Sequence, residues 1–320
     1  MRRNRNLIID AYNLFTRHYV AHPAMSENGD QIGGVVGFLN NLVNMTERVN
    51  PQRVYIIWES GGSKRKRDLF SDYKKGKRPQ KLNRYYDQDI PDTVQNRNYQ
   101  VKLLVEILSC FPVTQIYVED SEADDAIGYM CKYKLHTDEN VVISSDHDFY
   151  QLLNKKTIIW SPTLKSFVNT NKVLERYNVH PNNFCLAKSI SGDSSDNIPG
   201  VKGVAYKNLS KYFSKFSLEE DYLIDEFLED ARDLRENKKL KMLDAINSAE
   251  VLIRRNWRLV HLDVNNLSAH QVAKIDEKIE NLNFSYDNMK AHKLLKNSGI
   301  KSLDLIRAGF VLKRLREVKK

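Results

Sequence analysis

The sequence lacks the features that mark secreted, thiolate-metal and membrane proteins. Its 320 residues include three cysteines, Cys110, Cys131 and Cys185, with no paired spacing and no Cys–His cluster. This pattern excludes a disulfide framework and a zinc site. No apolar run approaches the roughly 20 residues of a membrane span, and no apolar signal core follows the charged N-terminus. We therefore expect a soluble, unexported protein of a reducing compartment, with no membrane partner.

The composition predicts a globular, basic protein. Hydrophobic residues make up 41% of the chain, enough for a substantial core, and 320 residues allow one large or two ordinary domains. The formal net charge is +9, and the chain holds 16 tyrosines. A basic surface of this kind suits a polyanionic partner such as a nucleic acid.

Carboxylates follow the predicted strands at their carboxyl ends. Residues 141–143 form an apolar, β-branched run, which is typical of a strand buried on both faces of a parallel sheet. In open α/β sheets the chemistry lies at the carboxyl ends of the strands, so acids there are candidate ligands. Asp10 alone is equally well explained as the cap of the next helix. The acids at strand ends are Asp10 after residues 6–9, Glu59 after residues 54–58, and Asp146 and Asp148 after residues 141–143.

A second acidic group opens a predicted helix after Ser121. Ser121 suits the N-cap position, and the helix dipole favours acids in a first turn. Capping alone does not require three acids in four positions, yet Glu122, Asp124 and Asp125 all occur here. At about 100° per residue their carboxylates fan across one side of the helix start. We expect the three carboxylates to converge on a positive group.

The stretch after residue 191 combines two acids with a glycine-bounded hairpin. Asp193 and Asp196 are three residues apart, so both face one way if their turn is helical; an ordinary Asp/Ser-rich loop is the alternative. A hairpin that precedes a helix presents backbone N–H groups to a phosphate, and nearby lysines add positive charge. The candidate phosphate-binding residues are Gly200, Lys202, Gly203 and Lys207.

Residues 64–84 form a strongly basic segment. It holds ten lysines and arginines against two aspartates, a net charge of +8 over 21 residues. A solvated face usually mixes its charges, so we interpret the segment as a phosphate-binding element; a merely soluble loop is the alternative. Lys74 or Lys77 is expected to offset charge on a reacting phosphate. The candidate DNA-binding residues of the segment are Arg65, Arg67, Tyr73, Lys75 and Arg78.

Together these motifs supply nine carboxylates, and such a gathering needs positive charge. Like charges repel one another and are costly to bury without partners. Divalent cations compensate them, and an oxygen-only set without histidine or cysteine selects Mg²⁺ or Mn²⁺. Two such ions can stabilise both the attacking and the leaving oxygens of phosphodiester hydrolysis. The candidate ligands are Asp10, Glu59, Glu122, Asp124, Asp125, Asp146, Asp148, Asp193 and Asp196.

Five short motifs also occur in a fixed order. They are Ile-Ile-Asp-Ala-Tyr-Asn at 8–13, Tyr-Lys-Lys-Gly-Lys at 73–77, Glu-Ala-Asp-Asp at 122–125, Ser-Ser-Asp-His-Asp at 144–148, and Gly-Asp-Ser-Ser-Asp-Asn-Ile-Pro-Gly-Val-Lys-Gly-Val at 192–204. In this order they resemble the phage and bacterial 5′ nuclease family of flap endonucleases and 5′-to-3′ exonucleases. Residues 256–262 also resemble the T-even phage ribonuclease H branch. Five motifs in order are specific, whereas any single one is not.

The resemblance implies the architecture. It implies an α/β fold with a central, mostly parallel sheet and helices on both faces, a PIN-like 5′ nuclease core, followed by a mainly helical region. The nuclease domain is expected over residues 1–180, with a basic arch over about 64–100. The helical domain is expected over residues 181–320, with a helix-hairpin-helix element over about 185–213.

The resemblance also implies roles for residues. Lys74 and Lys77 match the basic pair at the foot of the arch, through which a 5′ single strand passes. The hairpin at 200–204 matches an element that grips duplex backbone and, in relatives, holds a K⁺ ion on its carbonyls. The implied metal ligands are Asp10, Glu59, Glu122 and Asp124 for one ion and Asp146, Asp148, Asp193 and Asp196 for the second, with Asp125 close by.

Two positions depart from the family pattern. Glu59 stands where the family usually has aspartate, which adds one methylene to a ligand and can shift preference toward Mn²⁺. Ala205 stands where the hairpin often has a second glycine, and its Cβ limits close backbone approach at the K⁺ position.

We therefore predict a 5′ nuclease that uses two Mg²⁺ ions, with Mn²⁺ able to substitute, to cut 5′ flaps and 5′ ends during primer removal in replication. The expected partners are flap or nicked DNA, an RNA·DNA primer duplex, and a single-strand-binding protein or polymerase. A monomer in the cytoplasm is expected, the host's if a phage encodes the chain. The alternatives are a non-catalytic DNA-binding relative, a metal-dependent single-strand ribonuclease and a structural cation site.

Overall fold

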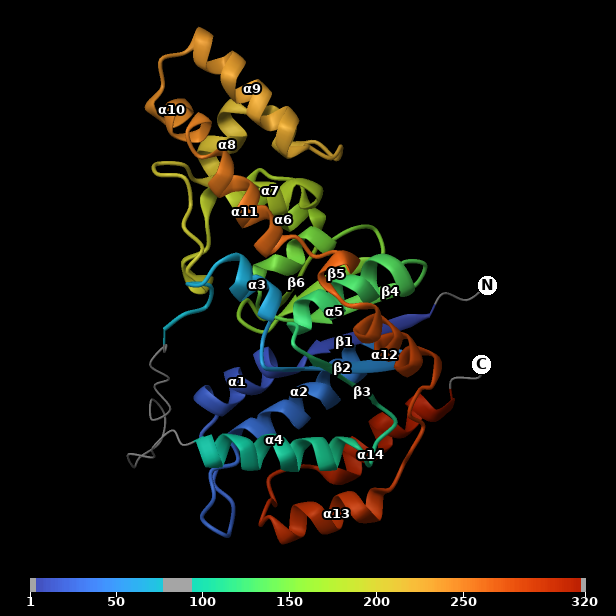
Figure 1. Cartoon of the computed structure of the whole chain (residues 1–320). Coiled ribbons are helices and arrows are strands. Elements are labelled where there is room, and N and C mark those ends of the chain that lie inside the picture. The colour runs from blue at the N-terminus through green and yellow to red at the C-terminus, as the bar shows by residue number, and fades with distance from the viewer. Residues whose placement is uncertain (1–3, 77–93, 318–320) are drawn as a thin grey trace.

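A computed structural model describes residues 4–76 and 94–317, and its centre is a six-stranded sheet (Figure 1). The strand order is β3-β2-β1-β4-β5-β6, and all neighbours are parallel except β5 and β6. The order changes direction between β1 and β4, which is where open α/β sheets bind ligands at their carboxyl edge. The strands are β1 (Arg5–Asp10), β2 (Arg53–Ser60), β3 (Thr114–Glu119), β4 (Glu139–Ile143), β5 (Thr157–Ser161) and β6 (Ser166–Val168).

Helices cover both faces of the sheet because its strands are apolar on both sides. Successive side chains of a strand alternate, so Leu7 and Ile9 of β1 enter one core while Ile8 enters the other. The first face is covered by α1 (Ala11–Ala21), α2 (Gly33–Val49), α4 (Val94–Leu108), α13 (Asn288–Asn297) and α14 (Leu305–Lys313). The second face is covered by α5 (Ala123–Tyr129), α6 (Thr170–Tyr177), α7 (Pro181–Ser191) and α12 (Ala269–Glu280).

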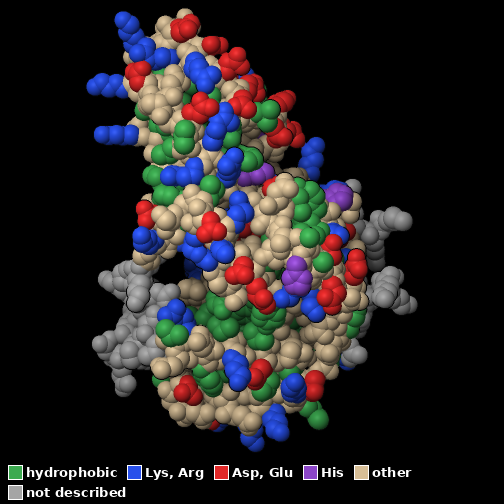
Figure 2. All heavy atoms as spheres, in the orientation of Figure 1, with side chains coloured by type: hydrophobic (Ala, Val, Ile, Leu, Met, Phe, Trp, Pro, Cys, Tyr) green, Lys and Arg blue, Asp and Glu red, His purple; other side chains and the backbone are tan. Residues whose placement is uncertain are grey.

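A helical lobe extends beyond the carboxyl end of the sheet and forms the narrow upper part of the molecule (Figures 1 and 2). The core of the second face continues into this lobe without a break, since Val142 of β4, Phe184 of α7 and Phe227 belong to one buried cluster. The short helix α3 (Lys64–Leu69) contacts the lobe at α11. The helices of the lobe are α8 (Tyr206–Tyr212), α9 (Ile224–Asn237), α10 (Lys241–Asn247) and α11 (Glu250–Val260).

The predicted fold class is confirmed: a mostly parallel sheet lies between helices and a helical region follows. The division into domains at residue 180 stays a prediction. The structure adds that α13 and α14, late in the chain, pack against α4 and α2 of the sheet's first face. Among the helices that the structure describes, none combines the length and the apolar character needed to cross a membrane.

Helices α1 and α2 pack closely because Gly37 has no side chain. A Cβ added to Gly37 would lie 2.5 Å from the ring of His18 on α1. We expect Gly37→Ala to lower the free energy of unfolding by about 1–3 kcal/mol, since the half-buried His18 ring must shift. Urea unfolding measures this loss. Asn40→Ala, one turn further along α2, is the matched control and should unfold near the wild-type midpoint; equal midpoints for all three proteins would contradict the close packing.

Candidate active site

Acidic side chains from four segments share one hollow at the carboxyl edge of the sheet. The hollow has a volume of about 430 Å³. Carboxylate oxygens of Asp124, Asp146 and Asp148 lie within 4.8 Å of one another beside it. The structure thus brings together acids that end β1, β2 and β4 with one acid from α5. The residues lining the hollow include Asp10, Glu59, Lys74, Asp124 and Asp146, together with Asn13, Arg17 and Thr163.

Asp10 is held in place by two hydrogen bonds. Its Oδ1 accepts from the backbone N–H of Asn13 at 3.2 Å, so it caps α1. Its Oδ2 accepts from the hydroxyl of Ser144 at 3.1 Å, and that hydroxyl oxygen accepts from the N–H of Asp146 at 3.1 Å. The capping role is confirmed, and it leaves Asp10 in the hollow, where its metal role stays a prediction.

The turn after β4 and the start of α5 are also fixed by carboxylates. Asp146 caps a short 3₁₀ turn, because its Oδ1 accepts from the N–H of Asp148 at 2.9 Å. The side chain of Glu59 reaches the start of α5, where its Oε2 accepts from the N–H of Ala123 at 3.0 Å. His147, between the two acids of the turn, is exposed and stacks on Tyr150 at 4.8 Å between ring centroids. The His147 ring therefore packs against an aromatic neighbour at the surface.

Burial disfavours charge on several of these acids. Burial, and then the neighbouring Glu59 carboxylate, raise the pKa of Asp10 to about 7. Burial also raises the pKa of Asp148 to about 7, although Lys188 opposes the shift. The pKa of Asp124 lies well above its usual range because of burial and the carboxylates of Asp146 and Asp10. An oxygen-only donor set of this kind, short of positive charge, fits a hard divalent cation.

Glu122 is held by three donors of the basic segment instead of facing the hollow. Lys66 Nζ lies 2.7 Å from its Oε2, the Tyr73 hydroxyl 2.9 Å from the same oxygen, and Lys74 Nζ 2.6 Å from its Oε1. Burial acts to raise the pKa of Glu122, but Lys66 and Lys74 prevail and lower it to about 2. In this arrangement Glu122 is a counter-ion, and its metal role stays a prediction.

Asp125 is buried beside Lys66 and does not line the hollow. It is fully buried, with its Oδ2 at 3.4 Å from Lys66 Nζ and its Oδ1 accepting from the amide of Asn266 at 2.7 Å. The expectation that Glu122, Asp124 and Asp125 meet at one positive group is met in part, since all three carboxylates act on Lys66 but only Glu122 and Asp125 pair with it. Glu122 and Asp125 share Lys66, whereas Asp124 turns to the hollow.

A buried lysine that the sequence analysis missed joins two other acids. Lys188 of α7 is 4% exposed, contacts Asp148 Oδ1, and lies 2.7 Å from Asp193 Oδ2. Burial acts to raise the pKa of Asp193, but Lys188 and Ser195 lower it to about 2. A lysine on the buried face of a helix, five residues before Asp193, is the signal that could have revealed this pair.

Asp196 and Lys74 connect the acidic turn after α7 to the basic segment. The backbone N–H of Lys74 donates to the carbonyl of Asp196 at 3.0 Å, and the two side chains lie 3.9 Å apart. Lys74 has a left-handed backbone, with φ of +51°. Burial raises the pKa of Asp196, although Lys74 opposes the shift. Lys74 thus lines the hollow, and its role toward a phosphate stays a prediction.

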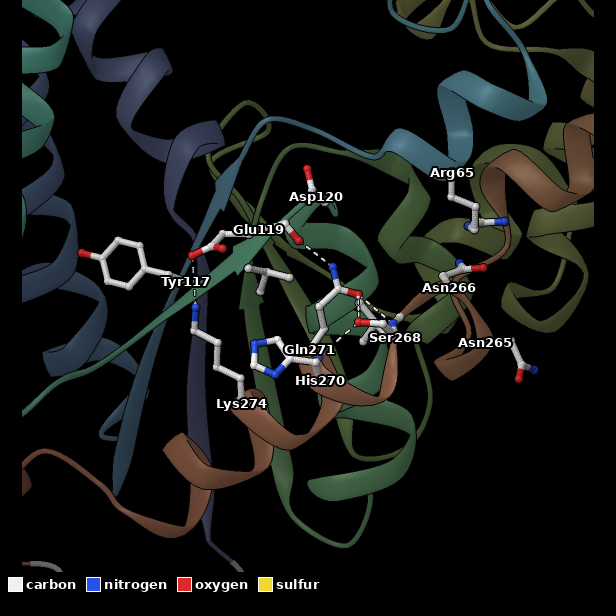
Figure 3. A pocket seen from close by; sticks show the side chains of 12 residues that line it. Arg65, Tyr117, Glu119, Asp120, Asn265, Asn266, Ser268, His270, Gln271 and Lys274 are labelled. Carbon is white, nitrogen blue, oxygen red and sulfur yellow. Dashed lines mark hydrogen bonds and ion pairs between the residues drawn. The ribbon is translucent and has the colours of Figure 1, made fainter.

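The other candidate residues of the basic segment differ in their exposure and contacts. Tyr73 is only 5% exposed and bonds to Glu122, so its expected contact with DNA is corrected to a structural role. Arg65 reaches from α3 toward Asn266, at a second pocket of about 530 Å³ between the end of β3 and α12 (Figure 3). Lys75 and Arg67 are exposed. The candidates Lys77 and Arg78 lie outside the described residues.

The hairpin packs tightly on the end of α7. A Cβ on Gly200 would lie 2.1 Å from the carbonyl oxygen of Ser191, which explains the glycine. The buried amide of Asn256 ties the two together by donating to the carbonyls of Ser189 at 2.9 Å and Pro199 at 2.8 Å. The remaining candidates here lie on the outside: Lys202, Gly203 and Lys207 are exposed. Their contacts with DNA stay predictions.

A parallel sheet with a carboxylate centre at its switch point, beside a hairpin and a basic helix, defines a PIN-like nuclease fold. A family model of the 5′-3′ exonuclease, N-terminal resolvase-like domain, matches residues 5–178. The chain belongs to this family, which confirms the family resemblance. The narrower likeness to the T-even phage branch stays a prediction.

Individual relatives agree with this family. The chain is 26% identical to a 5′-3′ exonuclease of Bacillus subtilis over 315 residues, covering 88% of this chain and 98% of the relative. It is 30% identical to DNA polymerase I of the same organism over 233 residues, which are 70% of this chain. The match spans only about a quarter of the polymerase relatives' length, 25% in each of two cases.

Solved structures share the fold. A bacteriophage T5 flap endonuclease in complex with DNA and metal ions superposes with a TM-score of 0.65 at 19% identity, covering 92% of this chain and 99% of the other. Flap endonuclease-1 from Methanococcus jannaschii gives a TM-score of 0.53 at 16% identity, covering 99% and 94%. At these identities the likeness is one of fold.

Lys66 is expected to be essential for stability because it serves two buried acids. Lys66→Met leaves Glu122 and Asp125 without their shared cation, and we expect a loss of about 3–5 kcal/mol in the free energy of unfolding. Lys66→Arg, which keeps the charge, should recover most of it. Lys64→Met, on the exposed side of the same helix, should unfold like the wild type. Urea unfolding of the wild type and the three variants measures these free energies. A Lys66→Met variant as stable as Lys64→Met would contradict the role of Lys66 as the shared cation.

The raised pKa of Asp10 predicts a pH-dependent stability. The folded protein holds this proton up to about pH 7, whereas the usual value is 3.8. The unfolded chain therefore loses the proton first, and the fold is destabilised progressively as pH rises from about 4 to 7. In EDTA at pH 8, Asp10→Asn should be more stable than the wild type by at least about 1 kcal/mol, and the gap should close toward pH 4. Thermal unfolding across this range measures the gap; a gap independent of pH would contradict the shift.

Proposed function

We propose that this chain is a metal-dependent 5′ nuclease that hydrolyses phosphodiester bonds at 5′ flaps and at the 5′ ends of duplex DNA or RNA·DNA. The observation that carries the proposal is the hollow in which Asp10, Glu59, Asp124 and Asp146 meet beneath Lys74, in a chain of the 5′-3′ exonuclease family. Primer removal during replication is the process that such an activity serves.

Two Mg²⁺ ions are the proposed cofactors, with Mn²⁺ able to substitute. Asp10, Glu59 and Asp124 would hold one ion and Asp146, Asp148 and Asp196 the other, while Glu122 and Asp193 join them if their lysines move. Bound there, the ions supply charge stabilisation for the attacking and leaving oxygens and activate water. The raised pKa values of Asp10 and Asp148 support this, because a cation relieves the repulsion that burial intensifies.

The chain's own residues contribute binding and orientation. Lys74, with its side chain 39% exposed, can turn from Glu122 toward a phosphate at the rim and offset its charge. Arg17 also lines the hollow, where its guanidinium donates to the hydroxyl of Thr163 at 2.9 Å. Both cations are positioned to orient a phosphodiester over the carboxylates. Arg17 was not singled out by the sequence, since it lies inside a helix far from the basic segment.

The hairpin is the proposed site for duplex backbone, with Gly200, Lys202, Gly203 and Lys207 as its residues. A K⁺ ion on its carbonyls is part of the proposal, although Ala205 departs from the usual glycine. A polymerase or a single-strand-binding protein is the proposed protein partner. Support for a polymerase comes from the DNA polymerase I relatives, in which the matching region is a quarter of a longer chain.

The direct test is cleavage of a 5′-labelled flap duplex, a blunt duplex and a single strand in Mg²⁺, Mn²⁺ and EDTA. We expect cutting near the flap junction that needs the metal. Asp146→Asn should reduce the rate by at least about 100-fold, as removal of a key electrostatic group does, while flap affinity stays the same or rises. Gel analysis of products and fluorescence anisotropy of the labelled flap give the two readouts.

The control for charge removal is Asp120→Asn, at the end of the neighbouring strand β3. Asp120 has a left-handed backbone that asparagine tolerates, and it does not line the hollow, so this variant should cut normally. Tight flap binding without cutting in either metal would indicate a DNA-binding relative. Cutting confined to single-stranded RNA would indicate a ribonuclease.

A further inference from the structure

Five exposed lysines line one edge of the helical lobe, and we call this surface the lysine edge. Two of them, Lys207 and Lys211, lie on α8, one helical turn apart. The other three, Lys238, Lys239 and Lys241, lie where α9 ends and α10 begins. Figure 2 shows Lys and Arg side chains projecting from the edge of the upper lobe where Figure 1 places α8 and α10.

Tyr212 joins the two halves of the lysine edge. The ammonium of Lys211 lies 5.4 Å from the centroid of its ring, and the ammonium of Lys238 lies 5.7 Å from the same centroid. The end of α8 and the start of the turn before α10 are therefore neighbours in space, although they are far apart in the sequence. Lys211 of α8 and Lys238 after α9 thus flank the same ring.

The lysine edge forms no ion pair within the part of the chain that the structure describes. Among the described residues, none of its five ammonium groups lies within 4.0 Å of a carboxylate oxygen. Five acids of α9, α10 and α11 pair with other cations, whereas Glu229, Asp233 and Glu236 of α9 are exposed and form no ion pair among the described residues. Lys215 pairs with Glu226 and Asp230, Arg235 with Asp244, Arg232 with Glu250, and Arg254 with Asp225 and Glu250.

Unpaired lysines in a row suit the backbone of a double helix. Lys207 and Lys211 are separated along α8 by a rise of about 6 Å, close to the axial rise of about two base pairs. Lysine acts as a point charge toward phosphate and carries no base-specific hydrogen-bonding pattern at that contact. The lysine edge also begins at the helix that follows the hairpin, so a duplex held by the hairpin would run along it.

We propose that the far half of the lysine edge, Lys238, Lys239 and Lys241, binds duplex phosphates beyond those held by the hairpin and so measures the length of the duplex arm. The proposal rests on the proposed nuclease function. Helix α8 is seven residues long, which is about 10 Å, or about three base pairs. Lys238, Lys239 and Lys241 therefore contact phosphates several base pairs further along the duplex than Lys202 does.

The test is a triple charge reversal, Lys238→Glu, Lys239→Glu and Lys241→Glu, assayed by anisotropy on flap substrates in EDTA. Each duplex arm is varied separately from about 6 to about 20 base pairs, with the short arms closed by a hairpin loop. Wild-type affinity should increase as one arm passes the reach of the lysine edge. The variant should lose that increase, bind the long arm at least about 10-fold more weakly, and show a salt slope shallower by about 3.

The matched control carries the same change of charge on the opposite end of the molecule. Lys290→Glu, Lys293→Glu and Lys296→Glu alter three exposed lysines of α13 and should keep the wild-type dependence on arm length. Thermal unfolding checks that both triple variants fold. If the reversal of Lys238, Lys239 and Lys241 leaves the dependence on both arms unchanged, or weakens short and long arms equally, the proposal is wrong.

Cleavage in Mg²⁺ on the same substrates separates this proposal from the nuclease function. Normal cutting by the wild type together with an unaltered length dependence in the variant would overturn the lysine edge alone. An uncut substrate whose binding depends on arm length and on the three lysines would overturn the nuclease function and support the lysine edge.

Discussion

Repulsion among carboxylates crowded at one edge of the sheet is the constraint on which the rest of this structure depends. The topology forces the crowding: β1, β2 and β4 are adjacent and parallel, so Asp10, Glu59 and Asp146 end at the same edge. Burial then makes each charge more costly, which is why the pKa of Asp10 rises to about 7. A chain with this edge must either import cations or supply them itself, and this chain supplies some through Lys66 and Lys188.

The internal cations also determine how distant segments join. Lys66 ties α3 to α5 through Glu122 and Asp125, while Lys188 ties α7 to the turn after β4 through Asp148. A buried ion pair contributes little net stability compared with apolar packing, but removing one partner is severely destabilising. These pairs therefore act mainly by excluding other arrangements of the segments. Lys66 therefore has two effects: it attaches the basic segment to α5, and it supplies positive charge to the acids beside the sheet.

The sequence was sufficient for the sheet and for the position of its acids, because an apolar run and the rule of strand ends are local signals. Residues 141–143 indeed end β4, and Asp10, Glu59 and Asp146 meet at one hollow. The sequence was not sufficient to predict which cations pair with these acids. Lys66 and Glu122 are 56 residues apart, so their pairing depends on tertiary packing alone. Tyr73 shows the same limit, since a tyrosine in a basic segment gave no sign of its burial.

The distribution of charge sets an order of events under the proposed function. In the hollow, Lys74 is bonded to Glu122, and among the described residues no ion pair engages Asp10, Glu59, Asp124 or Asp146, so their negative charge opposes an arriving phosphate. Divalent ions held by these carboxylates would reverse that sign and let the hollow attract a phosphodiester. The lysine edge is unpaired and lies on the lobe, so it needs no ion to hold a duplex. Under the proposed function, binding of the duplex arm and reaction at the hollow therefore depend on separate groups. The lysine edge is positive without metal, whereas the hollow would become positive only with bound divalent ions.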